Sequence, residues 1–271
     1  MRLSGYFTLL ALFAITLSCN PASKKEVAET VPGLNNGKQN KEKFGYCDSV
    51  SNSGVSVRVN LWMPSDSGEV TKEISAQLDK KVIERINSYA DSASVASNPE
   101  ARNSVKAAYE VFAKNYAAFK KEFPDAPGCW EVEVKGDTIM VTPKVFLYQI
   151  DHYSFTGGAH PNSFKSLHIF DGKTGAEMEM KTFVSDTAAL LKKVEAAFRK
   201  TEKLTSDKDL EEEGYFLSNH RFFLPANYSF TRNGILFYYN PYEIAPYVKG
   251  VIQFTIPYAE LNGMVKKELV F

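Results

Sequence analysis

Two apolar periods follow one another between residues 55 and 86, and together they constrain the fold more than any other feature. From Val55 to Met63 apolar and polar residues alternate, which is typical of a half-buried β-strand. After Pro64, apolar residues recur every four positions from Val70 to Ile86, which predicts an amphipathic helix over residues 69–90. A chain with both periods is neither all-helical nor all-β.

The remaining patterns extend this alternation of helices and strands. A second helix is expected over residues 100–122, with an aromatic stripe from Tyr109 to Phe123 in the core. A third helix is capped by Ser185 or Asp186. Hairpins are expected for 130–135 with 138–151 (turn Gly136-Asp137), 163–170 with 176–181, and 228–231 with 235–239 (turn Asn233-Gly234), and a last strand over 250–256. We therefore expect an α+β fold: antiparallel sheets packed with about three amphipathic helices.

Charge and cysteine content exclude two classes of protein. The 271 residues carry 32 basic and 32 acidic side chains, so no overall basic field supports nucleic-acid binding, and no nucleic-acid partner is expected. Three cysteines are too few for a disulfide scaffold.

The first nineteen residues have the features of a secretion signal. Arg2 precedes a mainly apolar run from Tyr6 to Leu17, which is short for a membrane span, and Ser18-Cys19 follows. This resembles a bacterial lipoprotein signal over residues 1–18, with Cys19 as the lipidated residue and the membrane reached through a lipid anchor. The alternative is a plain secretory signal with an incidental cysteine. We expect a cell-envelope, extracytoplasmic protein on the periplasmic face or the outer membrane.

The segment that follows predicts a linker and then two domains. Residues 19–43 lack aromatic residues and periodicity, which predicts a flexible tether. The expected domains are residues 44–152 and 153–271. Residues 44–271 hold 26 basic and 29 acidic side chains, which weakly favours a basic partner.

Catalytic motifs are scarce. The chain has no glycine-rich phosphate loop, no G-x-S-x-G, no H-E-x-x-H and no C-x-x-C. Outside the cytoplasm two lone thiols often pair, so Cys47 and Cys129 are expected to form a disulfide; two separate buried thiols are the alternative. No cofactor is expected.

Two chemical sites can be drawn from the titratable residues. A metal site from Asp151, His152, His160 and His168 is conceivable, but its spacings fit no familiar ligand motif, so no metal is predicted. A hydrolase acting on glycan or peptide could use Asp151, His160 and Glu243 as acid and base groups. This is the alternative to a protein without enzymatic activity.

Two local sequences stand apart from the rest. In YSFTGGAHP (153–161), Gly157-Gly158 permits backbone conformations closed to other residues, which predicts a tight connection between two strands. In NPYEIAPYVKG (240–250), two Pro-Tyr pairs hold aromatic rings on a stiff loop. Residues 215–258 contain 13 aromatic residues, which are divided between core and surface.

These two motifs together resemble the RsiV-like domain family, named for the extracytoplasmic part of an anti-sigma factor that binds lysozyme. Residues 50–150 look like the domain that precedes it there and in the peptidoglycan deacetylase PdaC. The resemblance implies an α+β fold in the cell envelope and a binding module rather than an enzyme. No deacetylase domain and no Asp-Asp or His-x-x-x-His motif is found, so deacetylase activity is not inferred.

The resulting hypothesis is a membrane-tethered binding module for a protein such as lysozyme or for peptidoglycan fragments. A structural lipoprotein without a soluble ligand is a further alternative. We expect the binding residues to be Tyr242, Pro246, Tyr247, Gly157, Gly158 and His160.

Overall fold

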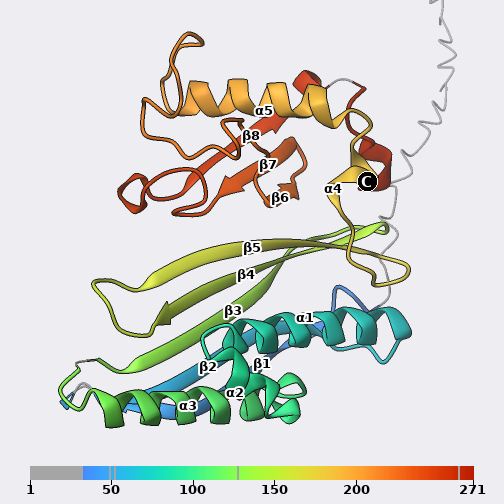
Figure 1. Cartoon of the computed structure of the whole chain (residues 1–271). Coiled ribbons are helices and arrows are strands. Elements are labelled where there is room, and N and C mark those ends of the chain that lie inside the picture. Colours follow the sequence, from blue (N-terminus) through green and yellow to red (C-terminus); the bar gives the residue numbers. More distant parts are fainter. Residues whose placement is uncertain (1–32, 49, 52, 127, 262) are drawn as a thin grey trace, which may run out of the picture.

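The computed structural model describes residues 33–271 except 49, 52, 127 and 262, and shows two sheets and two groups of helices in layers (Figure 1). The expected signal, Cys19 and the beginning of the tether lie outside the described residues. Within the described residues, no helix has the length and apolarity needed to cross a membrane.

The larger sheet has five strands in the order β1-β2-β3-β4-β5. Neighbouring strands are antiparallel except β2 and β3, which are parallel because the helical segment crosses over between them. The strands are β1 (Gly37–Asp48), β2 (Ser53–Pro64), β3 (Trp130–Val141), β4 (Val145–Phe155) and β5 (Asn162–Asp171).

The crossover helices cover one face of this sheet (Figure 1). Helix α1 (Glu69–Asn87) buries the side chains at the expected four-residue spacing. The expected helix over 100–122 is divided into a short turn, η1 (Pro99–Arg102), and α3 (Val105–Glu122), which Ser104 caps. A five-residue helix, α2 (Ser92–Ala96), lies between α1 and η1. The aromatic stripe is core at Phe112, but Phe123 lies beyond the end of α3 and is 50% exposed.

Strand β1 corrects the expected tether. Residues 37–43 pair with β2 instead of forming a linker, and the pairing extends along the whole strand. The first seven residues of β1 carry no large apolar side chain, so no hydrophobic pattern marks them. The strand is held by backbone pairing at a sheet edge, where lysines are common because they oppose further strand addition.

Strand β3 corrects the first expected hairpin, because it continues through Gly136, with a shift in register between Thr138 and Met140, and the chain turns only at residues 142–144. A Cβ on Gly136 would lie 2.7 Å from Cε1 of Tyr148 and 2.8 Å from Cδ2 of Leu61. The glycine is therefore needed for close packing inside a strand, not for a turn.

Two further expectations on this sheet need correction. After β5, residues 176–181 return only as a single bridge between Phe170 and Glu177, followed by the short helix α4 (Met180–Phe183). The expected domain boundary at 152/153 falls inside β4, and β5 belongs to the same sheet.

The second layer contains a three-stranded sheet with α5 (Thr187–Thr201) on its far side (Figure 1). Asp186 caps α5 by accepting a hydrogen bond from the backbone N–H of Ala189 at 2.8 Å, as expected. The hairpin at Asn233-Gly234 is also confirmed. The strands are β6 (Asn227–Phe230), β7 (Gly234–Tyr239) and β8 (Ile252–Pro257), and the 3-10 turns are η2 (Tyr247–Lys249), η3 (Tyr258–Leu261) and η4 (Lys267–Leu269).

Strand β4 contributes to two hydrophobic cores. Phe146 and Tyr148 point to the core under α1 and α3, whereas Val145 and Leu147 point to the core shared with α5 and β6–β8. Successive strand residues face opposite sides, so one strand joins both cores. The described elements confirm the α+β class.

Two long-range features complete the fold. Cys47 and Cys129 form the expected disulfide, with 5.6 Å between their Cα atoms. The outer edge of β5 is covered by asparagine side chains: Asn240 Oδ1 accepts from the N–H of Lys165 at 2.7 Å, and its Nδ2 donates to the carbonyl of Lys165 at 2.9 Å. Asn227 Oδ1 accepts from the N–H of Leu167 at 3.0 Å.

Candidate functional site

His160, Tyr242 and Tyr247, three of the expected binding residues, meet in one group that we call the aromatic cluster. The His160 ring stacks on Tyr247 with centroids 4.3 Å apart and lies 6.4 Å from Tyr242. The hydroxyl of Tyr242 lies 3.4 Å from Nε2 of His160. Tyr242 is 53% and Tyr247 36% exposed, so the cluster presents aromatic surface to solvent.

The connection between β4 and β5 brings His160 to this cluster. Gly157 and Gly158 have φ values of +94° and +103°, a region that side chains with a Cβ rarely adopt. A Cβ on Gly158 would meet no atom within 4 Å, so the backbone conformation, not space, requires glycine there. These two glycines shape the turn, and His160 supplies the ring.

The segment 240–250 positions the two tyrosines. The Glu243 carboxylate accepts hydrogen bonds from the N–H groups of Asn240 at 2.9 Å and Ala226 at 3.2 Å, which closes the Asn-Pro-Tyr-Glu turn. Inside that turn Tyr242 has a φ of +67°, an uncommon conformation for a bulky residue. Pro246 begins the turn η2 that carries Tyr247. Strained backbone of this kind clusters at functional sites.

A cleft of about 450 Å³ lies beside the cluster. It exists because the outer face of β4 changes character along its length: Val145 and Leu147 are buried in a core, whereas Asp151 and Tyr153 line the cleft. Further lining residues are Glu133, Lys135, His152, Ser163, Phe164, Lys165, Tyr238, Pro241, Tyr247, Gly250 and Val251. Charged residues at alternate positions of β3 were a sequence signal for this face that our site prediction missed.

The charged residues of the cleft are paired. Lys165 Nζ lies 2.7 Å from Asp151 Oδ1, and Lys135 Nζ lies 3.0 Å from Glu133 Oε1. Burial and the nearby charge of Asp151 raise the pKa of the Tyr238 phenol, so it stays protonated and can donate a hydrogen bond.

The hydrolase set does not assemble. Asp151 pairs with Lys165, and Glu243 binds backbone N–H groups. Among the described contacts of His160, the ring nitrogens reach the carbonyl of Pro161 and the hydroxyl of Tyr242, not a carboxylate.

The metal set does not gather either, since His152 and His168 contact Ser166 on the opposite face of the sheet from Asp151. Among the described residues, no group of three or more His, Cys, Asp or Glu side chains is arranged to hold a metal ion.

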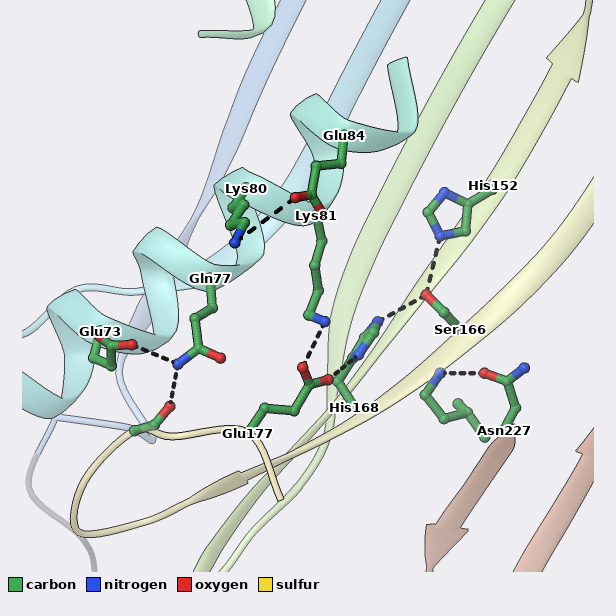
Figure 2. Close-up of polar contacts among 12 residues, drawn as sticks. Glu73, Gln77, Lys80, Lys81, Glu84, His152, Ser166, His168, Glu177 and Asn227 are labelled. Carbon is green, nitrogen blue, oxygen red and sulfur yellow. Dashed lines mark hydrogen bonds and ion pairs between the residues drawn. The ribbon is translucent and has the colours of Figure 1, made fainter. Parts of the chain in front are cut away.

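A polar chain that our sequence reading did not predict crosses from α1 to β4 (Figure 2). Lys81 Nζ donates to Glu177 Oε2 at 2.7 Å, and His168 Nδ1 lies 2.7 Å from Glu177 Oε1. Ser166 Oγ lies 2.9 Å from Nε2 of His168 and 3.1 Å from Nε2 of His152. The only sequence signal was the two-residue spacing of Ser166 and His168, which places them on one face of a strand.

Two side chains of this polar chain have shifted pKa values. Burial opposes the ionisation of Glu177, but hydrogen bonds from His168 and Lys81 outweigh it and lower its pKa to about 2. Burial, followed by the positive charge of Arg85, lowers the pKa of His152 to about 3. At neutral pH Glu177 is therefore ionised and His152 is neutral.

Two family models match separate parts of the chain. Residues 53–163 match the family described as Deacetylase PdaC, and residues 183–259 match the family described as Protein of unknown function (DUF3298). No protein with a curated description matches the chain.

Two solved DUF3298-family structures show the same fold. The one from Bacteroides fragilis NCTC 9343 has a TM-score of 0.65 at 17% identity and covers 87% of this chain and 96% of its own. The one from Pseudomonas aeruginosa PAO1 has a TM-score of 0.58 at 18% identity and covers 88% of this chain and 98% of its own.

The cleft lies where the two matched ranges meet. Its residues from Glu133 to Tyr153 lie in the range that matches the PdaC family, and those from Tyr238 to Val251 lie in the range that matches DUF3298.

Proposed function

We propose that this protein is a non-enzymatic binding module of the cell envelope, tethered to the membrane by a lipid on Cys19. Its ligand is a protein such as lysozyme or a fragment of peptidoglycan. The observation that carries the proposal is the exposed aromatic cluster, formed by rings that two separate segments bring together. The resemblance to the RsiV-like family supports a binding role, and the matches to PdaC and DUF3298 support a place in the cell envelope.

Holding Tyr242 in this arrangement costs free energy. Tyr242 keeps a strained φ of +67° while more than half of its side chain remains in solvent. Such strain costs of order 1–3 kcal/mol, and an exposed ring offsets little of it through burial within the chain. Burial of the ring by a partner would supply free energy that offsets this strain. Tyrosine is also a frequent anchor at binding interfaces.

Two other features support this location. The Cys47–Cys129 disulfide is consistent with an oxidising, extracytoplasmic compartment. The short apolar run before Cys19 supports the lipid anchor.

The test measures binding of residues 33–271 to immobilised lysozyme and, separately, to purified muropeptides. We expect one of the two to bind, and Tyr242→Ala with Tyr247→Ala to weaken that binding at least tenfold, the loss typical of an interface anchor. Tyr46→Ala is the matched control, because this tyrosine is 73% exposed on another element. Failure of both ligands to bind at tens of micromolar protein would refute the proposal.

One observation favours a second candidate function, a hydrolase that uses other residues than those expected from the sequence. Ser166, His168 and Glu177 stand in the order nucleophile, base and orienting carboxylate, at 2.9 Å and 2.7 Å. In an acyl transfer, Ser166 Oγ would attack the ester carbonyl while its proton moves to Nε2 of His168. That proton would then pass to the leaving alkoxide, and water would release the acyl group.

A serine-reactive fluorophosphonate probe tests this candidate. Covalent labelling seen by intact mass, and lost in Ser166→Ala, would support it. If the wild-type protein is not labelled, the hydrolase candidate is wrong and the binding function is the only one of the two that remains.

A further inference from the structure

The floor of the cleft is a row of alternating charges that sum to zero. Across β3, β4 and β5 the cleft-lining charged residues are Glu133, Lys135, Asp151 and Lys165. The register places Lys135 opposite Asp151 and Asp151 opposite Lys165, so donors and acceptors alternate across the strands. Gln149 continues the row, since its Oε1 accepts from Lys165 Nζ at 3.1 Å.

Aromatic side chains line the same space. Tyr153 comes from β4, Tyr238 from β7 and Tyr247 from the turn η2. Tyr247 also belongs to the aromatic cluster, so the cleft and the cluster form one continuous surface.

We infer that this cleft binds a neutral saccharide, and this inference rests on the proposed binding function. Sugar hydroxyls both donate and accept hydrogen bonds, which suits a floor of alternating carboxylates and ammonium groups. The C–H face of a sugar ring is apolar and packs against aromatic rings such as those of Tyr153 and Tyr247. The saccharide class therefore matches both the floor and the lining aromatic rings.

The same geometry disfavours the two other ligand classes. A strongly charged ligand would have to compete with ion pairs that already satisfy each charge, such as Lys165 with Asp151. An extended peptide would need a free strand edge, but Asn227 and Asn240 already occupy backbone groups of β5 at Lys165 and Leu167.

The experiment measures binding of three probes to residues 33–271 by calorimetry and by NMR titration. The probes are the neutral tetrasaccharide of N-acetylglucosamine, a sulfated heparin-derived tetrasaccharide, and the free stem peptide of peptidoglycan. We expect the neutral tetrasaccharide alone to bind saturably, with an affinity that high salt leaves nearly unchanged because no net charge is neutralised.

The test variant is the double substitution Asp151→Asn with Lys165→Met. It removes both charges of one ion pair without changing the net charge. We expect at least a tenfold loss of saccharide affinity and an unchanged thermal midpoint within a few degrees. The matched control is Lys106→Met with Glu110→Gln, an exposed pair on α3 with 3.9 Å between its charged atoms. This control should bind like the wild type.

The outcomes separate this inference from the proposed function. If the neutral tetrasaccharide does not bind at millimolar concentration, or if the sulfated probe or the peptide binds more tightly, the inference is wrong. Lysozyme or muropeptide binding that persists in the Asp151→Asn, Lys165→Met variant would then leave the proposed function standing. If the wild type binds neither lysozyme nor muropeptides, the proposed function itself is wrong.

Discussion

His152 is buried between the ring of Phe164 and the hydroxyl of Ser166, and this position keeps its imidazole uncharged. The two rings stack with centroids 4.3 Å apart, and Nε2 reaches Ser166 Oγ. The guanidinium of Arg85 lies over Phe164, 4.2 Å from the ring centroid. A second positive charge at His152 would therefore be buried close to an existing one.

This position predicts a pH dependence of stability. The pKa of His152 is about 3 in the folded protein against an ordinary value of 6.5, so unfolding takes up a proton below pH 6.5. Stability should fall as the pH drops from 6.5 toward 3, and His152 alone should remove about 2 kcal/mol at pH 5.

Urea unfolding of the wild type and of His152→Gln between pH 5 and 8 measures this effect. The variant should lose most of the slope between pH 7 and 5. His220→Gln, which removes a histidine with an 88% exposed side chain, should keep it. Equal slopes for the wild type and His152→Gln would contradict the prediction.

At the scale of single residues, the sequence predicted part of the site. Unusual glycine and proline content marked Gly157 and Pro246, and the exposed rings of His160, Tyr242 and Tyr247 did meet. The cleft-lining residues Lys165 and Tyr238 were not predicted, because the pattern of a strand does not show which part of a sheet face the second layer leaves open.

At the scale of elements, β3 shows how a glycine can mislead. Gly136-Asp137 has the composition of a turn, but Val132, Val134 and Gly136 are all buried on one face, so the period of two continues through the glycine. On the neighbouring strand β4, the side chain of Tyr148 packs against Gly136. A period that stays in phase across a glycine is therefore better evidence than the turn composition.

Gly136→Ala should destabilise the protein by about 1–3 kcal/mol, the cost of overpacking a filled core. The added Cβ would lie 2.7 Å from Cε1 of Tyr148, so the ring or the strand must shift. A urea midpoint equal to or above that of the wild type would show that the site has spare room. If Gly136 were in an exposed turn, no such loss would occur.

At the scale of the whole molecule, the two cores and the disulfide join distant parts of the chain. The helix spacing of α1, the cap of α5 and the hairpin at Asn233-Gly234 could be predicted, because each depends on local sequence. Strand β1 could not be predicted, because its stability comes from pairing with β2. The placement of β5 in the first sheet likewise depends on long-range pairing.

Removing the disulfide tests the contribution of one such long-range link. Cys47 and Cys129 are 82 positions apart, so Cys47→Ala with Cys129→Ala should lower the free energy of unfolding by about 4 kcal/mol in the chain-entropy model. Urea unfolding of the double variant measures this. A loss below about 1 kcal/mol would mean that the unfolded chain gains little freedom when the bridge is absent.

Asn240, whose side chain covers the edge of β5, has a consequence for the chemical lifetime of the protein. Asparagines usually deamidate when the next backbone nitrogen attacks the side-chain amide and forms a succinimide. Asn240 is followed by Pro241, which has no backbone N–H, so this route is closed. The amide that both donates to and accepts from Lys165 is thereby protected from ageing into a carboxylate, which would lose the donor.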